Sequence, residues 1–197
     1  MPVSYTNRKG QTYFLCQRVT KTGKSRYFFA KNSWQNVLEE IPDGYHIEES
    51  VNGVVSLVKN RPQLILPEEV QLVETALQRH PKGNNYRVSV KGEQITIHER
   101  VGPDAETIAK IFEGTVSPLS RKDILDRTHT ILDKKARFSP ILRFALVNVE
   151  TRNFCAERVT YMTSRPGWIN ISDCGPLQTL VDEIITLLDT DEYFELL

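Results

Sequence analysis

A Gly-Lys-Ser triplet near the N-terminus is the first candidate for phosphate chemistry. A phosphate-binding loop needs a second glycine five residues before Gly23, and a helix after it whose backbone N–H groups point at the phosphate. Arg18 stands at the glycine position, and the strand-like run from Arg26 to Phe29 follows the triplet. We therefore interpret residues 22–25 as the polar turn of a β-hairpin rather than as a nucleotide site.

The titratable and nucleophilic side chains show no spacing that is typical of a catalytic or metal site. No two histidines have the i, i+4 spacing of a metal-binding helix, and no Gly-x-Ser-x-Gly elbow occurs. The histidines are His46, His80, His98 and His129. Neighbouring carboxylates, which are frequent, would not face each other on a helix. The sequence thus predicts no catalytic residue, no metal and no cofactor, while an enzyme with a site assembled from scattered residues stays an alternative.

The three cysteines are odd in number and far apart, and no C-x-x-C spacing occurs. This usage is typical of a reducing compartment and predicts a cytoplasmic protein. Cys16 and Cys155 fall in apolar strand-like runs, so we expect them in the core. Cys174 comes just before a predicted helix, where a helix can lower the pKa of a thiol, although the adjacent Asp173 opposes that effect.

The sequence predicts that the chain does not enter a membrane, because no apolar signal core and no run of 18 apolar residues occurs. The charge is balanced overall, with 25 basic and 25 acidic residues, but it is unevenly spread. Residues 1–31 hold seven Lys or Arg and no acid, whereas residues 166–197 hold seven acids and no Lys or Arg. Either the N-terminal segment is a basic binding face beside an acidic tail, or the two ends meet and neutralise each other.

Within the basic segment, cations alternate with aromatic residues along a predicted hairpin. Cations contact phosphate and release counterions, and exposed aromatic rings stack on unpaired bases. We therefore predict that this hairpin binds nucleic acid. The candidate residues are Tyr13, Arg18, Lys21, Lys24, Arg26 and Tyr27. The alternative is that the aromatics form the core of a small module and the cations only keep its edge soluble.

The acidic C-terminal segment supports a second hypothesis, in which the chain is an adaptor. Its last residues include Tyr193, Phe194, Leu196 and Leu197, which we expect to be exposed. An exposed apolar cluster of this kind would dock on a protein partner or on a second copy of the chain.

The predicted elements of residues 1–60 make a small module with the order β-β-α-β-β. It contains the hairpin around residues 12–29, a helix over residues 34–41 capped by Ser33, and a second hairpin. The second hairpin turns at Asn52-Gly53, which is a typical type I′ sequence. Residues 61–67 are predicted to be a linker or docking segment between two prolines.

Residues 68–197 are predicted to form a larger module with several strands and helices. We expect a helix from Pro67 to about residue 80, a hairpin over residues 86–97, helices after Asp104 and Ser120, strands over 141–149, 154–162 and 168–171, and a last helix after Pro176. Hairpin turns between most strands favour antiparallel sheets. The predicted fold class is therefore α+β.

Two N-terminal runs carry a resemblance to other proteins. They are Tyr5-Thr6-Asn7-Arg8-Lys9-Gly10-x-Thr12-Tyr13 and Lys21-Thr22-Gly23-Lys24-x-Arg26-Tyr27-Phe28. These runs resemble the openings of an uncharacterised family of bacterial proteins. That family has no assigned activity, so the resemblance implies no site and no reaction.

Overall fold

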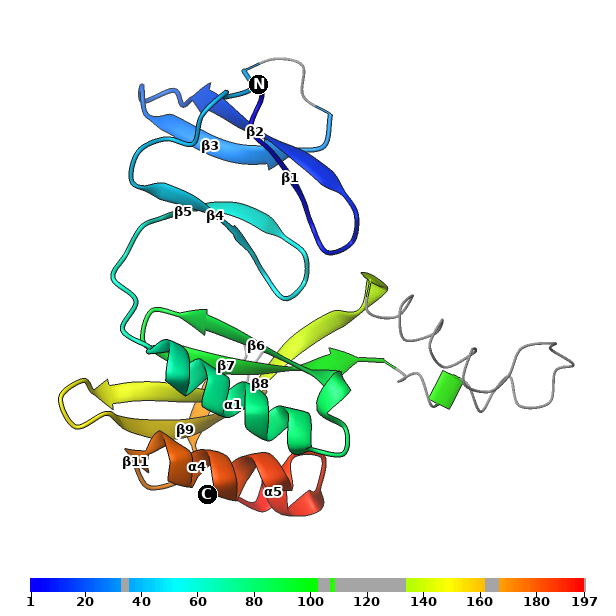
Figure 1. The fold of residues 1–197 in the computed structure, drawn as a ribbon, viewed down its shortest axis with the longest axis vertical. Helices are drawn as coiled ribbons and strands as arrows, with labels where there is room; N and C mark the ends of the chain where they lie inside the picture. The colour runs from blue at the N-terminus through cyan, green and yellow to red at the C-terminus, as the bar shows by residue number, and fades with distance from the viewer. Residues whose placement is uncertain (33–35, 103–106, 109–133, 162–166, 197) are drawn as a thin grey trace, which may run out of the picture. The chain divides into compact units, whose positions relative to one another are not determined.

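A computed structural model of the chain describes residues 1–32, 36–102, 107–108, 134–161 and 167–196. The chain divides into two compact units. Unit 1 comprises Met1–Arg61 and Gly102–Arg137, and unit 2 comprises Pro62–Val101 and Phe138–Leu197. Both contain antiparallel strands, and unit 2 adds short helices, so the predicted α+β class is confirmed (Figure 1).

The described part of unit 1 contains a three-stranded sheet and a separate hairpin (Figure 1). The sheet has the order β1-β2-β3, with β1 at Ser4–Thr6, β2 at Thr12–Val19 and β3 at Ser25–Ala30. The hairpin consists of β4 at Tyr45–Glu49 and β5 at Val55–Lys59. Aromatic and β-branched residues dominate β2 and β3, because such side chains fit a pleated and half-buried surface.

Three hairpin turns of unit 1 share one geometry. Each ends on a glycine with positive φ, namely Gly10 at +75°, Gly23 at +76° and Gly53 at +76°. Each of these glycines donates its N–H to the carbonyl three residues earlier, at 2.8–2.9 Å. A type I turn followed by a left-handed glycine gives the right-handed twist that the flanking strands need. These turns therefore fix the register of each hairpin.

The predicted type I′ turn at Asn52-Gly53 is wrong. That turn requires positive φ at both central residues, and of these two only Gly53 has it. The Ser50 hydroxyl accepts a hydrogen bond from the N–H of Val54 at 3.1 Å. This contact, together with the backbone bond from Ser50 N–H to the Val54 carbonyl, closes a loop of residues 51–53 instead of a two-residue loop.

The helix predicted over residues 34–41 is not found in its described part, residues 36–41. Val37 instead forms an antiparallel bridge with Cys16 of β2. The edge of β2 carries backbone donors and acceptors that must be paired when they are buried. Pairing with this edge outweighs the modest helix propensity of the segment, which the sequence pattern alone cannot show.

Unit 2 is built on a six-stranded sheet with the order β10-β9-β8-β7-β6, and β11 pairs with β9 (Figure 1). The strands are β6 at Tyr86–Lys91, β7 at Gln94–Val101, β8 at Arg137–Asn148, β9 at Asn153–Thr160, β10 at Gly167–Asn170 and β11 at Gly175–Pro176. The strands predicted near residues 86–97, 141–149, 154–162 and 168–171 are thus confirmed where they are described. The helices predicted after Asp104 and Ser120 fall almost wholly outside the described residues.

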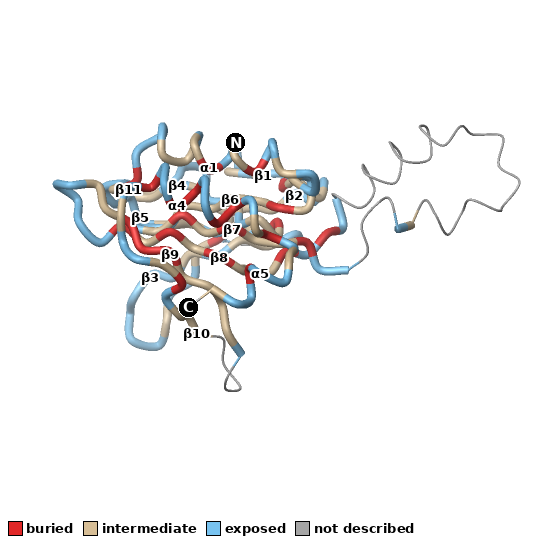
Figure 2. The backbone as a smooth tube through the Cα atoms, turned by 90° about the horizontal axis from the view of Figure 1, so that it is seen from below, coloured by how far each residue is buried: buried red, intermediate tan, exposed pale blue. Residues whose placement is uncertain are grey.

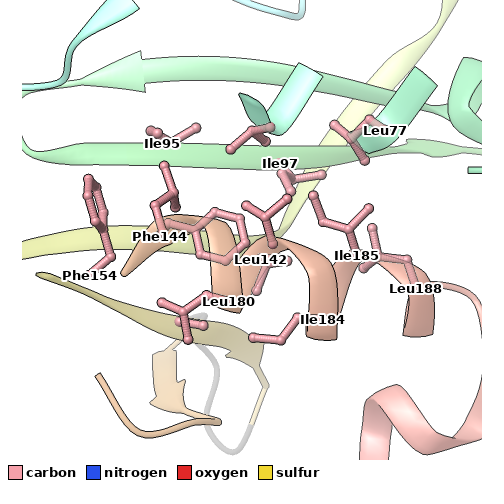
Figure 3. Packing of buried hydrophobic residues seen from close by; sticks show 14 of the residues in the cluster. Leu77, Ile95, Ile97, Leu142, Phe144, Phe154, Leu180, Ile184, Ile185 and Leu188 are labelled. Carbon is pink, nitrogen blue, oxygen red and sulfur yellow. The ribbon is translucent and has the colours of Figure 1, made fainter. Parts of the chain in front are cut away.

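Helices cover one face of this sheet. They are α1 at Pro67–Arg79, α4 at Leu177–Ile184 and α5 at Asp191–Glu195, with 3-10 turns η1 at Gly83–Asn85 and η2 at Ile185–Leu187. Figure 3 shows the core, in which Ile97 of β7 and Leu142 of β8 pack with Ile184 of α4. Figure 2 marks the buried stretches along β7, β8 and β9. The alternate residues of these strands face away from the helices.

The first helix of unit 2 begins and ends as the sequence predicts. Pro67 occupies the first turn, and the Glu69 carboxylate accepts a hydrogen bond from the N–H of Leu66 at 2.8 Å. His80 has an extended backbone, because the residue before a proline disfavours the helical region. Val73 and Leu77 are buried, so the helix turns its apolar stripe toward the sheet.

An arginine in the turn between β8 and β9 holds the segment before α1. Arg152 donates from Nε to the Glu69 carboxylate at 2.9 Å and from Nη2 to the Leu64 carbonyl at 3.1 Å. Ile65, next to that carbonyl, is only 1% exposed and belongs to the core of unit 2. Part of the predicted linker at 61–67 is therefore packed against the sheet.

Cys155 and Cys174 form a disulfide. Gly175 of β11 lies opposite Phe154 of β9, so the preceding Cys174 lies opposite Cys155. Cys174 is therefore not a free thiol, and its place before a helix does not make it a reactive cysteine. Cys16 is free and buried, as predicted. A disulfide is typical of oxidising environments and so weakens the cysteine-based reason for the cytoplasmic location, which stays an untested prediction.

Reducing this disulfide should destabilise unit 2. Its sequence separation is 19, and opening a loop of that size costs about 3 kcal/mol in unfolding free energy. Urea unfolding monitored with and without a thiol reductant measures the difference. A Cys174→Ala variant should match the reduced protein and show no response to reductant. The disulfide would be contradicted if the unfolding curves of the wild type with and without reductant coincided. Three titratable thiols in the untreated protein would contradict it as well.

Candidate nucleic-acid interface

The two faces of the β2–β3 hairpin differ sharply in their side chains. Residues directly opposite each other share a face, and successive residues alternate. Leu15 lies opposite Phe29, and both share one face with Tyr27. This face, here called the packed face, meets the β4–β5 hairpin, because the Tyr27 ring lies 5.5 Å from that of Tyr45 in an edge contact.

The two tyrosines predicted to contact bases both belong to the packed face. Tyr27 is half-buried against Tyr45, and Tyr13 is half-buried opposite Tyr5 of β1. The Tyr13 hydroxyl donates to Gln11 at 2.9 Å. These tyrosines therefore lie on the face opposite to Arg18 and Arg26, and their contact with bases stays a prediction.

The opposite face of the hairpin, here called the cationic face, carries the arginines. Arg18 of β2 lies directly opposite Arg26 of β3, and both are exposed. Neither side chain has a hydrogen bond or ion pair with any residue that the structure describes. Like charges placed directly opposite on a sheet repel, so this pair costs stability unless an anion lies between them.

One aromatic residue that the sequence analysis did not select shares the cationic face. Phe28 is two residues after Arg26, so it points to the same side, and it lies opposite Cys16. Its side chain is 39% exposed, and its ring contacts no other ring or cation in the described residues. The two-residue spacing from Arg26 is visible in the sequence and could have identified it.

The remaining two candidate cations lie in the turn of the hairpin. Lys21 and Lys24 are both exposed. Thr20 orders the turn, since its hydroxyl accepts a hydrogen bond from the N–H of Lys24 at 3.1 Å. Ser25 begins a strand rather than a helix, so the interpretation of the Gly-Lys-Ser triplet as a hairpin turn is confirmed. The four predicted cations thus occupy one tip of unit 1, separated from the two predicted tyrosines by the sheet.

One acid of unit 1, Glu49, is engaged with β1 and with the β1–β2 turn. The Glu49 carboxylate accepts hydrogen bonds from the Tyr5 hydroxyl at 3.0 Å and from the backbone N–H of Arg8 at 2.8 Å. The bond to Glu49 raises the pKa of Tyr5, because it stabilises the protonated phenol. This carboxylate fastens the β1–β2 turn to β4 and leaves the cationic face positive.

Comparison with protein-family models, with curated proteins and with solved structures finds no match to this chain. Among the described residues, no helix has the length and apolar content to cross a membrane. The same residues contain no group of three or more His, Cys, Asp or Glu side chains arranged to hold a metal. The functional argument therefore depends on the geometry of the chain itself.

A serine–histidine contact on unit 2 is the arrangement closest to a catalytic pair. Ser89 Oγ of β6 lies 2.8 Å from His98 Nε2 of β7, and burial lowers the pKa of His98. A catalytic histidine needs a partner that orients its other nitrogen. His98 Nδ1 is buried and has no hydrogen-bond partner in the described structure. The pair is a cross-strand contact that lacks the third member of a triad.

A second group of titratable side chains lies at one end of the unit 2 sheet. Burial raises the pKa of Glu99, and the nearby Asp189 carboxylate raises it further, while Lys82 lowers it. Lys82 forms an ion pair with Asp189. Burial also raises the pKa of Tyr86, which lies opposite Glu99 in the sheet. The surroundings of Glu99 in the folded protein therefore disfavour its negatively charged form.

The C-terminal residues belong to the core more than the adaptor hypothesis assumed. Tyr193 is only 3% exposed and donates its hydroxyl to the Ile141 carbonyl at 3.0 Å. Leu196 packs against the core, whereas Phe194 is 65% exposed. The expected exposure is therefore wrong for Tyr193, whose hydrogen bond and apolar ring both favour burial. Leu197, the last residue of this cluster, lies outside the described residues.

Replacing Glu99 by glutamine should stabilise the protein at neutral pH. The folded state raises the pKa of Glu99 above its usual 4.5, so the group's favourable contribution is present below that value and lost as pH rises through the raised pKa. Urea unfolding at about pH 7 should show a gain for Glu99→Gln that disappears near pH 3.5. An equal loss of stability at both pH values would contradict the assignment.

Replacing Arg18 by glutamate should stabilise unit 1 while weakening any contact with phosphate. The change converts a repulsive cross-strand pair with Arg26 into an attractive one, worth about 0.5 kcal/mol at low salt. Chemical unfolding measures this gain. Lys21→Glu is the control, because Lys21 lies in the turn and faces no cation across the ladder. A loss of stability in Arg18→Glu at low salt would show that the arginines do not repel.

Proposed function

We propose that this protein binds nucleic acid through the cationic face and turn of the β2–β3 hairpin. The observation that carries the proposal is the direct opposition of Arg18 and Arg26, both exposed and without an acidic partner among the described residues. Lys21 and Lys24 extend the same positive surface around the turn. Phosphate groups are the polyanion that such a cluster would neutralise.

The shape of the element also fits this function. The turn of the hairpin carries Lys21 and Lys24, both exposed, so these cations can approach a phosphate backbone closely. The net charge of the chain is zero, so attraction would be local to the hairpin rather than spread over the whole surface. Binding would therefore be oriented by one element and would depend strongly on salt.

The two tyrosines have a different role in this proposal from the four cations. Tyr13 and Tyr27 pack within unit 1, so the proposal assigns them a structural role in holding the hairpin. The cations Arg18, Lys21, Lys24 and Arg26 keep their proposed role as phosphate contacts. If the protein does not bind nucleic acid, the alternative is that it docks on a protein partner or on a second copy of the chain.

The test is fluorescence polarisation with labelled single-stranded DNA, duplex DNA and RNA over a salt series. The variant is Lys21→Glu, Lys24→Glu, Arg26→Glu, which removes three cations of the hairpin. Loss of three phosphate contacts should weaken binding and reduce the slope of log affinity against log salt by about two to three units.

A matched control is the variant Arg61→Glu, Arg79→Glu, Lys91→Glu, which changes the net charge equally. These three residues are exposed and lie away from the β2–β3 hairpin in the chain. The control should bind as the wild type does. Equal losses of affinity in both variants would show that the effect depends on net charge and not on the hairpin. Absence of binding by the wild type at low salt would exclude the proposed function.

A further inference from the structure

We infer that the nucleic acid bound by this hairpin is single-stranded at the site, with an unpaired base stacked on Phe28. This inference rests on the proposed function and adds the class of nucleic acid to it. The observation that carries it is the position of one exposed aromatic ring among the cations of the cationic face. Phosphate contacts need only cations, so an exposed aromatic ring among the cations points to an additional contact with a base.

The register places Phe28 beside both arginines. Phe28 follows Arg26 by two residues, which is about 6.6 Å along a strand, on the same face. Arg18 lies opposite Arg26, so the ring also lies diagonally across the ladder from it. A strand of nucleic acid crossing this face would meet a flat ring and two guanidinium groups within one short stretch.

Phe28 differs from its aromatic neighbours in the face that it occupies. Phe29 and Tyr27 point to the packed face, where Tyr27 contacts Tyr45 of the β4–β5 hairpin. Phe28 keeps 39% of its surface exposed and has no ring partner in the described part of the chain. Phe28 therefore offers part of its ring to solvent on the same face as Arg18 and Arg26.

A duplex offers this ring a base face only if two base pairs are unstacked, which costs stacking free energy. Bases in a duplex are stacked on each other and offer only their edges in the grooves, whereas an unpaired base offers its face. Stacking of an aromatic side chain on a base is tolerant of sequence, because every base has a π-face. The combination of guanidinium groups and one exposed ring therefore favours single strands with little sequence preference.

The experiment compares Phe28→Leu and Phe28→Trp with the wild type. Leucine keeps an apolar side chain opposite Cys16 but has no π-face, and tryptophan keeps the π-face. The probes are a labelled single-stranded oligonucleotide of mixed sequence and the same oligonucleotide annealed to its complement. Thermal unfolding of each variant checks that the hairpin is intact.

We expect the wild type to bind the single strand more tightly than the duplex. Phe28→Leu should lose about tenfold in affinity for the single strand, as is typical for one stacked base, with little change for the duplex. Phe28→Trp should bind at least as tightly as the wild type. Phe194→Leu, which alters another exposed aromatic residue, should leave both affinities unchanged.

The outcomes separate this inference from the proposed function. If the wild type binds neither probe at low salt, the proposed function fails and the inference fails with it. If binding depends on the hairpin cations but the duplex is bound as tightly as the single strand, or Phe28→Leu loses no affinity, the inference alone is overturned. Preferential loss of single-strand binding in Phe28→Leu, with unfolding unchanged and Phe28→Trp intact, supports it.

Discussion

Side chains on a β-strand alternate between two faces, and this constraint organises both units of the chain. In unit 2 the alternation directs Ile97, Leu142 and Phe144 toward α1 and α4, where they form a continuous core. The intervening residues, such as Ser89 and His98, face away from those helices, and these two contact each other across the strands. Once one face is buried, a slip of one residue would exchange the two sets, so the register is strongly specified.

In unit 1 the same constraint separates two kinds of side chain that are mixed along the sequence. Three glycine-ended turns set the hairpin registers, and the turn at Gly23 places Arg18 opposite Arg26. The packed face receives Tyr27 and meets the β4–β5 hairpin. The cationic face receives the charges together with Phe28. An alternating sequence of cations and aromatics therefore becomes a structural face and a charged face.

The cationic face conflicts with what stability alone would favour. A cross-strand pair of unlike charges would stabilise the hairpin slightly, and the chain has an arginine pair instead. Proteins tolerate such local conflicts mainly where a function needs them, since folding is carried by the rest of the structure. In unit 1 the Glu49 contacts to the β1–β2 turn, at 2.8 and 3.0 Å, and the packed face supply that support.

Sequence pattern by itself determined the α+β class, the helix from Pro67 and most strands, because these depend on local periodicity and on turn residues. It also determined that Arg26 and Phe28 share a face, since residues two apart on a strand must do so. Only the tertiary structure decided that residues 36–41 pair with β2 instead of forming a helix, and that Cys155 meets Cys174. It also decided that the face with Tyr27 meets the β4–β5 hairpin. These outcomes depend on contacts between segments distant in the chain, whose energies no local pattern contains.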